Sequence, residues 1–245
     1  MNAVRFEHVS KRFGALAVLN DVSFEIPQGQ AFCLLGRSGT GKSVTLRHII
    51  GLVQPDSGKV FVEKHDIGAL SRRSLGEVRT HLGFLFQNAA LFDSMSVGDN
   101  VAFPMRRHTK WSDRDIRDRA AKKLADVGLE TAYDKMPADL SGGMKKRAGL
   151  ARAMALDPPI LLVDEPSAGL DPITADEIDE LLLKLKEQGG VTLIIVTHNI
   201  PSARRLGDEL LMLHEGKIMA QGPPDEMDKS DNEIVRSFLT SSHAG

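Results

Sequence analysis

The chain of 245 residues has little cysteine, no long apolar run and no excess of one charge. Its single cysteine, Cys33, excludes an internal disulfide framework and is typical of a protein from a reducing compartment. The apolar runs, such as residues 31–35, are far shorter than the roughly 20 residues that cross a bilayer. We therefore expect no membrane span, and residues 1–10 lack the apolar stretch of a signal peptide.

The charges are balanced, with 31 basic and 33 acidic residues and a net charge of −2. Because surfaces that bind nucleic acid carry an excess of lysine and arginine, this balance argues against nucleic acid as a partner. Hydrophobic residues make up 42% of the chain and charged residues 26%, which excludes disorder or a coiled coil as the dominant state. The length predicts one or two domains with a core that needs neither a disulfide nor a structural metal.

Three short apolar runs are predicted to be fully buried strands: residues 31–35, 160–163 and 193–196. They are too short for helices and too continuous for strands with one exposed face. Because helical patterns separate them, they indicate a parallel sheet in an α/β fold. Two other segments alternate apolar and polar residues, which predicts strands with one exposed face: Val4, Phe6 and His8, then Val22, Phe24 and Ile26.

The clearest predicted helix has Asp171 as its N-cap and Pro172 at its first position, and Gly189 is placed to end it. Between about residues 88 and 157 we find helical patterns and no convincing buried strand. The economical interpretation is a mostly helical insertion within an α/β core.

The segment 36–43, Gly-Arg-Ser-Gly-Thr-Gly-Lys-Ser, follows a predicted buried strand and precedes a helical stretch. This is the context of a phosphate-binding P-loop, in which glycines let backbone N–H groups surround the phosphates. The helix start adds positive potential. Lys42 is expected to reach the β- and γ-phosphates, and the hydroxyl of Ser43 is expected to coordinate Mg²⁺.

Two adjacent carboxylates, Asp164 and Glu165, follow the predicted strand 160–163. Ligands of open α/β sheets bind beyond the carboxyl ends of the strands, so these carboxylates are expected to face the nucleotide. Asp164 suits a magnesium ligand, direct or through water. Glu165 suits the general base that polarises the attacking water.

Residues 140–144, Leu-Ser-Gly-Gly-Met, resemble the signature motif of ABC-type ATPases, and they precede the acidic pair as they do in that family. Other motifs of the family occur in order. Phe13 resembles the aromatic residue that stacks on adenine, Gln87 the Q-loop glutamine and His198 the switch histidine, while residues 167–171 resemble the D-loop. The resemblance spans nearly the whole chain. Alone, Phe13 would be read as a core residue, His198 as a loop histidine and Ser141 as a helix N-cap.

The resemblance implies a P-loop ATPase fold with a mixed sheet, an N-terminal antiparallel β subdomain and an inserted helical subdomain. Residues 1–245 then form one ATPase domain, with a catalytic core of 1–87 and 158–245 and a helical subdomain at 88–157. It also implies ATP and Mg²⁺ as cofactors. The implied catalytic residues are Lys42, Gln87, Glu165 and His198, and the implied magnesium ligands are Ser43, Gln87 and Asp164. The implied nucleotide-binding residues are Phe13, Gly36, Arg37, Ser38, Gly39, Thr40, Gly41, Lys42, Ser43, Thr45, Ser141, Gly142, Gly143 and Asp171.

Met144 stands where most members of the family have glutamine. With this methionine and the segments 90–97 and 100–104, the chain resembles the branch that serves MCE-type phospholipid transporters, including the system that maintains lipid asymmetry. The resemblance implies an ATPase subunit on the cytoplasmic side of the inner membrane. Its implied partners are a second copy of itself, an integral membrane permease, an MCE-domain protein and a small STAS-type accessory subunit.

Two segments have two interpretations each, and a third has one. Leu91, Phe92, Met95 and Val97 form either a docking patch for a helix of the membrane subunit or inward packing onto the helical insertion. The basic run 145–147 is predicted to be a solvated helix face. Residues 234–245 are either a docking tail or a frayed end.

Three other classes of protein with a P-loop are alternative interpretations of the sequence. An ABC importer for a small polar solute has every catalytic motif and differs mainly at Met144 and residues 90–104. A soluble ABC-type ATPase acting on ribosomes or DNA usually has two ATPase modules or a long coiled-coil insertion, which this sequence lacks. In a P-loop kinase a phosphoryl acceptor replaces water, and the signature motif and His198 argue against it.

Overall fold

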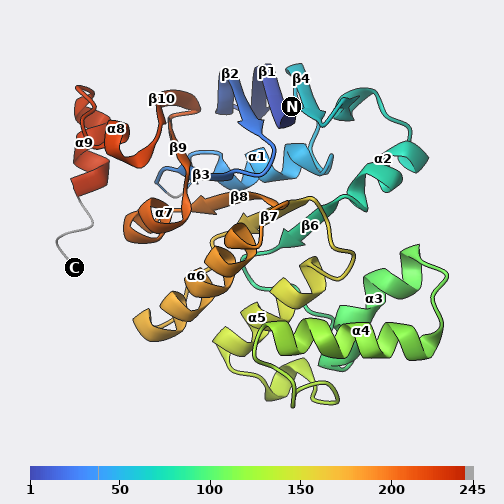
Figure 1. Cartoon of the computed structure of the whole chain (residues 1–245). Helices are drawn as coiled ribbons and strands as arrows, with labels where there is room; N and C mark the ends of the chain where they lie inside the picture. Colours follow the sequence, from blue (N-terminus) through green and yellow to red (C-terminus); the bar gives the residue numbers. More distant parts are fainter. Residues whose placement is uncertain (38, 241–245) are drawn as a thin grey trace.

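The computed structural model describes residues 1–37 and 39–240 and has two sheets with helices between and below them (Figure 1). One sheet is antiparallel, with the strand order β2-β1-β4-β5, and the other is mixed, with the order β10-β9-β3-β8-β7-β6. The strands are β1 (Asn2–Phe13), β2 (Leu16–Pro27), β3 (Ala31–Leu35), β4 (Ser57–Val62), β5 (His65–Asp66), β6 (Leu82–Leu85), β7 (Ile160–Asp164), β8 (Thr192–Thr197), β9 (Glu209–His214) and β10 (Lys217–Gly222).

The three predicted buried runs are the strands β3, β8 and β7, which lie side by side and parallel, so the α/β prediction is confirmed. Their side chains alternate between two hydrophobic cores. In β3, Phe32 and Leu34 face the core shared with the antiparallel sheet, whereas Cys33 and Leu35 face the core on the side of the helical region. Because both faces are covered, these strands have no polar side.

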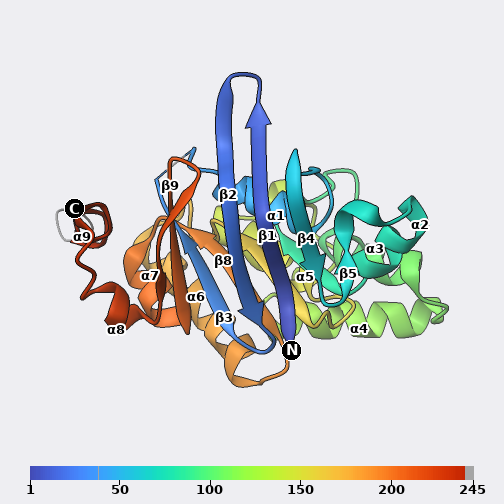
Figure 2. The same ribbon diagram turned by 90° about the horizontal axis from the view of Figure 1, so that it is seen from above.

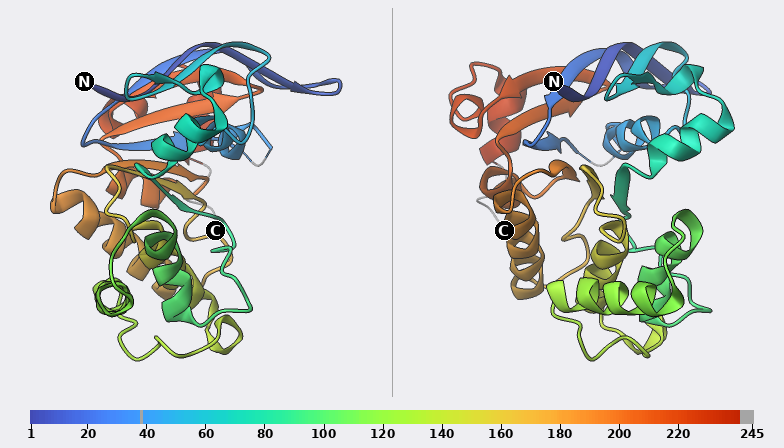
Figure 3. Two further views of the ribbon diagram at one scale, coloured as in Figure 1. Left: turned by 90° about the vertical axis from the view of Figure 1, so that its right-hand side faces the viewer. Right: turned by 45° about the vertical axis from the view of Figure 1, so that its right-hand side comes forward.

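Helix α1 (Lys42–Ile49) lies between the two sheets (Figure 3). Leu46 and Ile49 of this helix are fully buried in the same core as Phe6 and Phe24 of the antiparallel sheet. The rings of Phe6 and Phe24 stack with centroids 4.5 Å apart. The antiparallel sheet therefore covers one side of the P-loop helix and fixes it against the mixed sheet.

The predicted alternation in β1 and β2 holds except at His8, which is exposed. The backbone of His8 has φ +50°, and the pairing with β2 shifts between Phe6 and Val9. This bulge adds one residue to the strand, so Val9 takes the inward position that simple alternation gave to His8. Beyond the bulge β1 and β2 continue as a long hairpin that projects from the molecule (Figure 2).

No strand occurs between residues 88 and 157, all of which the structure describes. The segment holds α3 (Val97–His108), α4 (Asp113–Asp126), the short 3₁₀ turn η2 (Pro137–Asp139) and α5 (Gly142–Ala153). The remaining helical elements are η1 (Ile67–Ala69), α2 (Arg72–Arg79), α6 (Pro172–Glu187), α7 (Ile200–Leu206), α8 (Pro224–Met227) and α9 (Glu233–Thr240). None of the described helices is long and apolar enough to cross a membrane.

Helix α6 begins as the sequence predicts. The carboxylate of Asp171 accepts the Thr174 backbone N–H at 3.1 Å, Pro172 is the first helical residue, and Gly189 follows the end with φ +74°. At the other end of the chain, residues 234–240 are not frayed, because α9 buries Val235, Phe238 and Leu239. Residues 241–245 of the same predicted tail lie outside the described residues.

The loop after Gln87 is held to α3 by a buried asparagine. The side chain of Asn100 accepts the Phe92 backbone N–H at 2.7 Å. Its amide nitrogen donates to the carbonyl oxygens of Phe92, Met95 and Ser96 at 3.0 to 3.3 Å. One side chain thus satisfies one backbone N–H group and three backbone carbonyl groups of this loop.

We predict that Asn100→Ala lowers the free energy of unfolding by about 3 kcal/mol, because it leaves a buried N–H and several carbonyls without partners. Urea unfolding followed by circular dichroism measures the loss. Asn88→Ala, at an exposed asparagine twelve positions earlier in the chain, is the matched control and should change stability by less than about 0.5 kcal/mol. Equal losses in the two variants would contradict the assignment.

Candidate functional site

A cleft of about 570 Å³ opens where the strands β3, β7 and β8 end at their carboxyl termini. Beyond these ends lie the P-loop, Glu165 and His198, and Gln87 follows the neighbouring strand β6. The cleft is lined by Val18, Arg37, Gly39, Gly41, Lys42, Ser43, Val44, Gln87, Glu165, His198 and Phe238. This position agrees with the rule that open α/β sheets bind ligands at the carboxyl ends of their strands.

Two glycines of the P-loop are required by their surroundings. A Cβ on Gly36 would lie 2.4 Å from the backbone oxygen of Leu213, and Gly36 has φ +153°. A Cβ on Gly41, which has φ +100°, would lie 2.7 Å from the backbone oxygen of Val18. Gly41 is also the N-cap of α1, so the free N–H groups of the first turn of the helix lie at the cleft. Ser38 of the predicted set lies outside the described residues.

The ammonium of Lys42 forms hydrogen bonds to the backbone of the P-loop. Its Nζ atom donates to the backbone oxygens of Gly36 at 2.7 Å and Arg37 at 3.0 Å, and it lies 3.6 Å from Oε1 of Glu165. Burial lowers the pKa of Lys42, and the charge and hydrogen bond of Glu165 offset part of this effect. A phosphate entering the cleft offers this buried charge a stronger, charge-assisted partner than a carbonyl.

Ser43 and Asp164 meet across the cleft floor, with the hydroxyl of Ser43 donating to Oδ1 of Asp164 at 2.8 Å. Burial raises the pKa of Asp164, the Ser43 hydrogen bond lowers it, and Glu165 raises it. A hydroxyl and a buried carboxylate oxygen at this distance fit a magnesium ion, which takes one or two protein oxygens together with phosphate oxygens and water. Gln87, the third predicted ligand, is exposed and lines the same cleft.

Glu165 is buried and has an unusual backbone. Its φ of +47° lies in the left-handed region that non-glycine residues rarely adopt. Oε2 of its carboxylate accepts from Nδ1 of His198 at 2.8 Å and from the His198 backbone N–H at 3.3 Å. The imidazole of His198 is mostly exposed, so the pair joins a buried carboxylate to a ring at the mouth of the cleft.

Several predicted nucleotide residues do not line the cleft, among them Thr45, Phe13 and Thr40. Thr45 is buried, and its hydroxyl donates to the Gly41 backbone oxygen at 3.2 Å. Phe13 is 50% exposed at the end of β1, with the ammonium of Lys11 over its ring at 5.5 Å. Thr40 belongs to the P-loop, and its hydroxyl donates to the Arg37 backbone oxygen at 2.9 Å.

The signature residues start α5 away from the cleft of their own chain. The hydroxyl of Ser141 accepts the Met144 backbone N–H at 3.3 Å, so the predicted N-cap is confirmed. Gly143 packs on α6, since a Cβ there would lie 2.3 Å from Cγ2 of Thr174. Ser141 and Gly142 are exposed, as is Asp171 at the start of α6.

Sequence reasoning missed three residues of the cleft: Val18 from β2, Val44 from α1 and Phe238 from α9. Val44 could have been found, because it directly follows the P-loop serine. Val18 and Phe238 carry no motif and reach the cleft only through the tertiary fold.

The structure separates the two interpretations of the apolar cluster residue by residue. Val97 is fully buried at the start of α3 and belongs to the core, as the inward-packing interpretation has it. Phe92 is exposed, as a docking patch requires, and its ring lies 5.1 Å from that of Phe103. The prediction of a solvated basic run is wrong at Lys146, which is only 5% exposed, because this side chain falls on the helix face that packs inward.

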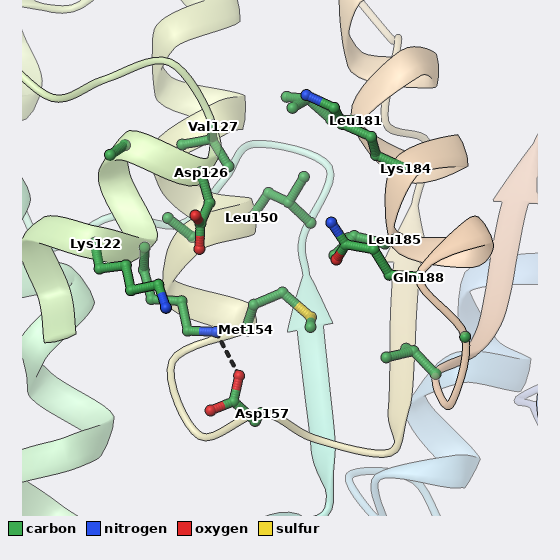
Figure 4. Close-up of a pocket in the computed structure, with 15 residues that line it drawn as sticks. Lys122, Asp126, Val127, Leu150, Met154, Asp157, Leu181, Lys184, Leu185 and Gln188 are labelled. Atoms are coloured by element: carbon green, nitrogen blue, oxygen red, sulfur yellow. Dashed lines mark hydrogen bonds and ion pairs between the residues drawn. The ribbon is translucent and has the colours of Figure 1, made fainter.

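A second hollow, of about 620 Å³, lies away from the P-loop, between α4, α5 and α6 (Figure 4). Leu150 of α5 and its C-cap Met154 face Leu181 and Leu185 of α6 across it, and an ion pair between Lys123 and Asp157 lies at one edge. It contains none of the predicted catalytic residues.

The family model described as ABC transporter matches residues 19–168. The chain is 44% identical over 243 residues to the probable ribonucleotide transport ATP-binding protein Mkl of Mycobacterium leprae. The aligned region covers 99% of this chain and 70% of that protein. It is 38% identical over 238 residues to the intermembrane phospholipid transport system ATP-binding protein MlaF of Escherichia coli K12, covering 97% of this chain and 88% of MlaF.

Among solved structures, the ATP-binding cassette MJ0796, dimeric and bound to ADP and phosphate in a post-hydrolysis state, has the same fold. The two share 32% identity with a TM-score of 0.84, over 90% of this chain and 98% of that one. The match of family, fold and cleft leads to one conclusion: the chain belongs to the ABC transporter family, as an ATP-binding subunit that hydrolyses ATP.

Proposed function

We propose that this chain, as a homodimer, powers the transport of a phospholipid through a membrane permease by hydrolysing ATP in the cleft at the ends of β3, β7 and β8. The observation that carries the hydrolytic part is that Glu165 lies within ion-pairing distance of Lys42 and within hydrogen-bonding distance of His198. An ammonium for the phosphates and a buried carboxylate for water are the groups that phosphoryl transfer to water requires.

The residues have separate roles in this proposal. The P-loop N–H groups and Lys42 bind the triphosphate, while Ser43, Asp164 and Gln87 hold Mg²⁺, which neutralises phosphate charge when bound. Glu165 accepts the proton of the attacking water. His198 holds the carboxylate through its Nδ1 atom and directs its ring toward the γ-phosphate.

We propose that the signature residues serve the partner subunit. Ser141 and Gly142 are exposed at a helix N-terminus and lie outside the cleft of their own chain. A helix N-terminus with small exposed residues is suited to phosphate. The dimeric form of MJ0796 supports an arrangement in which the ATP of one subunit meets Ser141 of the other. In this arrangement Phe13 stacks on adenine, and Asp171 lies near the interface.

The phospholipid part of the proposal is supported by Met144, by the segment 90–104 and by the 38% identity to MlaF, a phospholipid transport ATP-binding protein. The exposed rings of Phe86, Phe92 and Phe103 line a groove of about 310 Å³ suited to an apolar helix of the permease. We further propose an MCE-domain protein and a small STAS-type subunit in the complex, which is attached to the cytoplasmic face of the inner membrane. Residues 88–157 act in it as a subdomain that moves relative to the core.

The second candidate is an importer of a small polar solute. It is favoured by the 44% identity to the M. leprae protein, whose name refers to ribonucleotide transport. The catalytic cleft is the same for both candidates, so only the transported substrate separates them.

Glu165→Gln should slow ATP hydrolysis by about a hundredfold or more, because the amide cannot accept the proton of water. The affinity for ATP should stay within about threefold, since the amide oxygen still accepts from His198. Phosphate release and equilibrium binding of a fluorescent ATP analogue measure the two effects. Turnover equal to that of the wild type would rule out Glu165 as the base.

Lys42→Ala and Ser141→Arg should each abolish hydrolysis in homodimers, for different reasons: the first removes the phosphate-binding ammonium and the second blocks the site offered to the partner. A heterodimer of one Lys42→Ala chain and one Ser141→Arg chain keeps one intact composite site. Purification through two different tags isolates it. We expect ATP binding and at least part of the cleavage to return at that site, and a heterodimer that binds no more ATP than the two homodimers would refute the shared site.

Purification of the chain with its companions from native membranes, followed by mass spectrometry, tests the transported substrate. We expect a permease, an MCE-domain protein and bound phospholipid, and faster ATP hydrolysis in the complex when phospholipid is added than when ribonucleotide is added. A solute-binding protein and stimulation by ribonucleotide would favour the polar-solute importer.

A further inference from the structure

Lys146, a buried lysine of α5, touches the catalytic loop of its own chain. It lies five positions after Ser141, and its Nζ atom donates to the backbone oxygen of Glu165 at 3.0 Å. It belongs to the helix that begins with the signature residues, whereas Glu165 follows β7 of the mixed sheet. The contact therefore joins the helical region to the backbone of the proposed catalytic base.

The backbone of Glu165 needs such a partner. A φ of +47° is unfavourable for a residue with a Cβ, and it persists only where surrounding groups hold it. The Glu165 N–H donates to the Val196 oxygen of β8 at 2.8 Å. The Glu165 oxygen accepts from Lys146 and also from the Ala168 N–H at 3.2 Å. Both ends of the residue are thus fixed, one by the sheet and the other by α5.

This strained conformation places the carboxylate. The side chain of Glu165 lies between Nδ1 of His198 at 2.8 Å and Nζ of Lys42 at 3.6 Å. A rotation of the Glu165 peptide would carry the carboxylate away from both. Burial lowers the pKa of Lys146, and the charges of Asp164 and Glu165 offset part of that effect. The same carboxylates thus stabilise the ammonium that holds the loop.

The first two turns of α5 contact both α6 and the loop that follows β7. In the first turn Gly143 packs directly on Thr174 of α6. Farther along, the hollow of about 620 Å³ separates Leu150 and Met154 from Leu181 and Leu185 (Figure 4). A movement of the signature end of α5 therefore reaches Glu165 through these turns, where Lys146 donates to its backbone oxygen.

We propose that Lys146 is a positioning residue for Glu165 and makes the hydrolytic competence of one site depend on ATP bound at the other. The proposal rests on the shared-site dimer of the proposed function. Ser141 of a chain contacts the ATP held by its partner, whereas Glu165 of that chain acts on its own ATP. A helix fixed at Ser141 by the partner's ATP keeps Lys146 on the Glu165 carbonyl, so each occupied site activates the opposite one.

Lys146→Met, which keeps the apolar stem and removes the donor, tests this proposal in the full-length dimer. We expect kcat for ATP hydrolysis to fall about tenfold while KM and the affinity for ATP change less than about threefold. The Hill coefficient for ATP should fall toward 1. Unchanged kcat and cooperativity would overturn the proposal.

The matched control is Lys186→Met. Lys186 also donates to a backbone oxygen, that of Leu206 at 2.9 Å, but it lies at the end of α6 outside the cleft. Its loss should lower the melting temperature and leave kcat within about twofold. If Lys146→Met lowers kcat no more than Lys186→Met does at an equal loss of stability, Lys146 has only a structural role.

A double-mutant cycle separates positioning from general damage. If Lys146 acts through Glu165, Lys146→Met should lower the residual rate of the Glu165→Gln enzyme less than about twofold. An undiminished tenfold loss in that background would contradict the proposal. If Lys146→Met does not fold, Lys146→Arg is the second variant, because it retains a donor. We expect its kcat to be within about threefold of that of the wild type. A loss of kcat above tenfold would contradict the proposal.

These outcomes separate two failures. Wild-type protein that does not hydrolyse ATP contradicts the proposed function itself. Wild-type protein that hydrolyses ATP with cooperativity that Lys146→Met leaves intact contradicts only the role of Lys146.

Discussion

The structure depends on a small group of buried charges at the carboxyl ends of β3 and β7. The ammonium of Lys42 and the carboxylates of Asp164 and Glu165 are removed from water, which is costly unless each has partners. Carbonyls of the P-loop, the hydroxyl of Ser43 and the imidazole of His198 supply them. The strands β3, β8 and β7 are parallel and lie side by side, so side chains that lie 121 to 123 positions apart in the chain meet within a few ångströms.

Features that depend on local backbone geometry could be predicted from the sequence. The positive φ angles of the P-loop glycines, the caps at Ser141 and Asp171 and the buried strands follow from requirements within a few residues. Features that depend on tertiary packing could not. The bulge at His8, the burial of Val97 and Lys146, and the approach of Phe238 to the cleft are set by elements far away in the sequence. Composition and periodicity cannot indicate which lysine of a basic run points inward.

Two buried polar side chains of the helical region bear on function. Asn100 closes the loop after Gln87, and Lys146 reaches the backbone of Glu165. Both are buried polar side chains that satisfy backbone groups of another segment, and such contacts are costly to break because the groups left behind stay away from water. A subdomain attached in this way can transmit a displacement to the cleft, which is what a transport ATPase requires of nucleotide binding.

The central claim is that one ATP is enclosed by two copies of the chain. The most direct measurement is the rate of ATP hydrolysis per chain as the protein concentration rises through the range in which dimers form, with the oligomeric state recorded by light scattering. The account predicts that the rate per chain follows the dimer fraction and is negligible for the monomer. A full rate from the monomer, or no hydrolysis at any concentration, would contradict it.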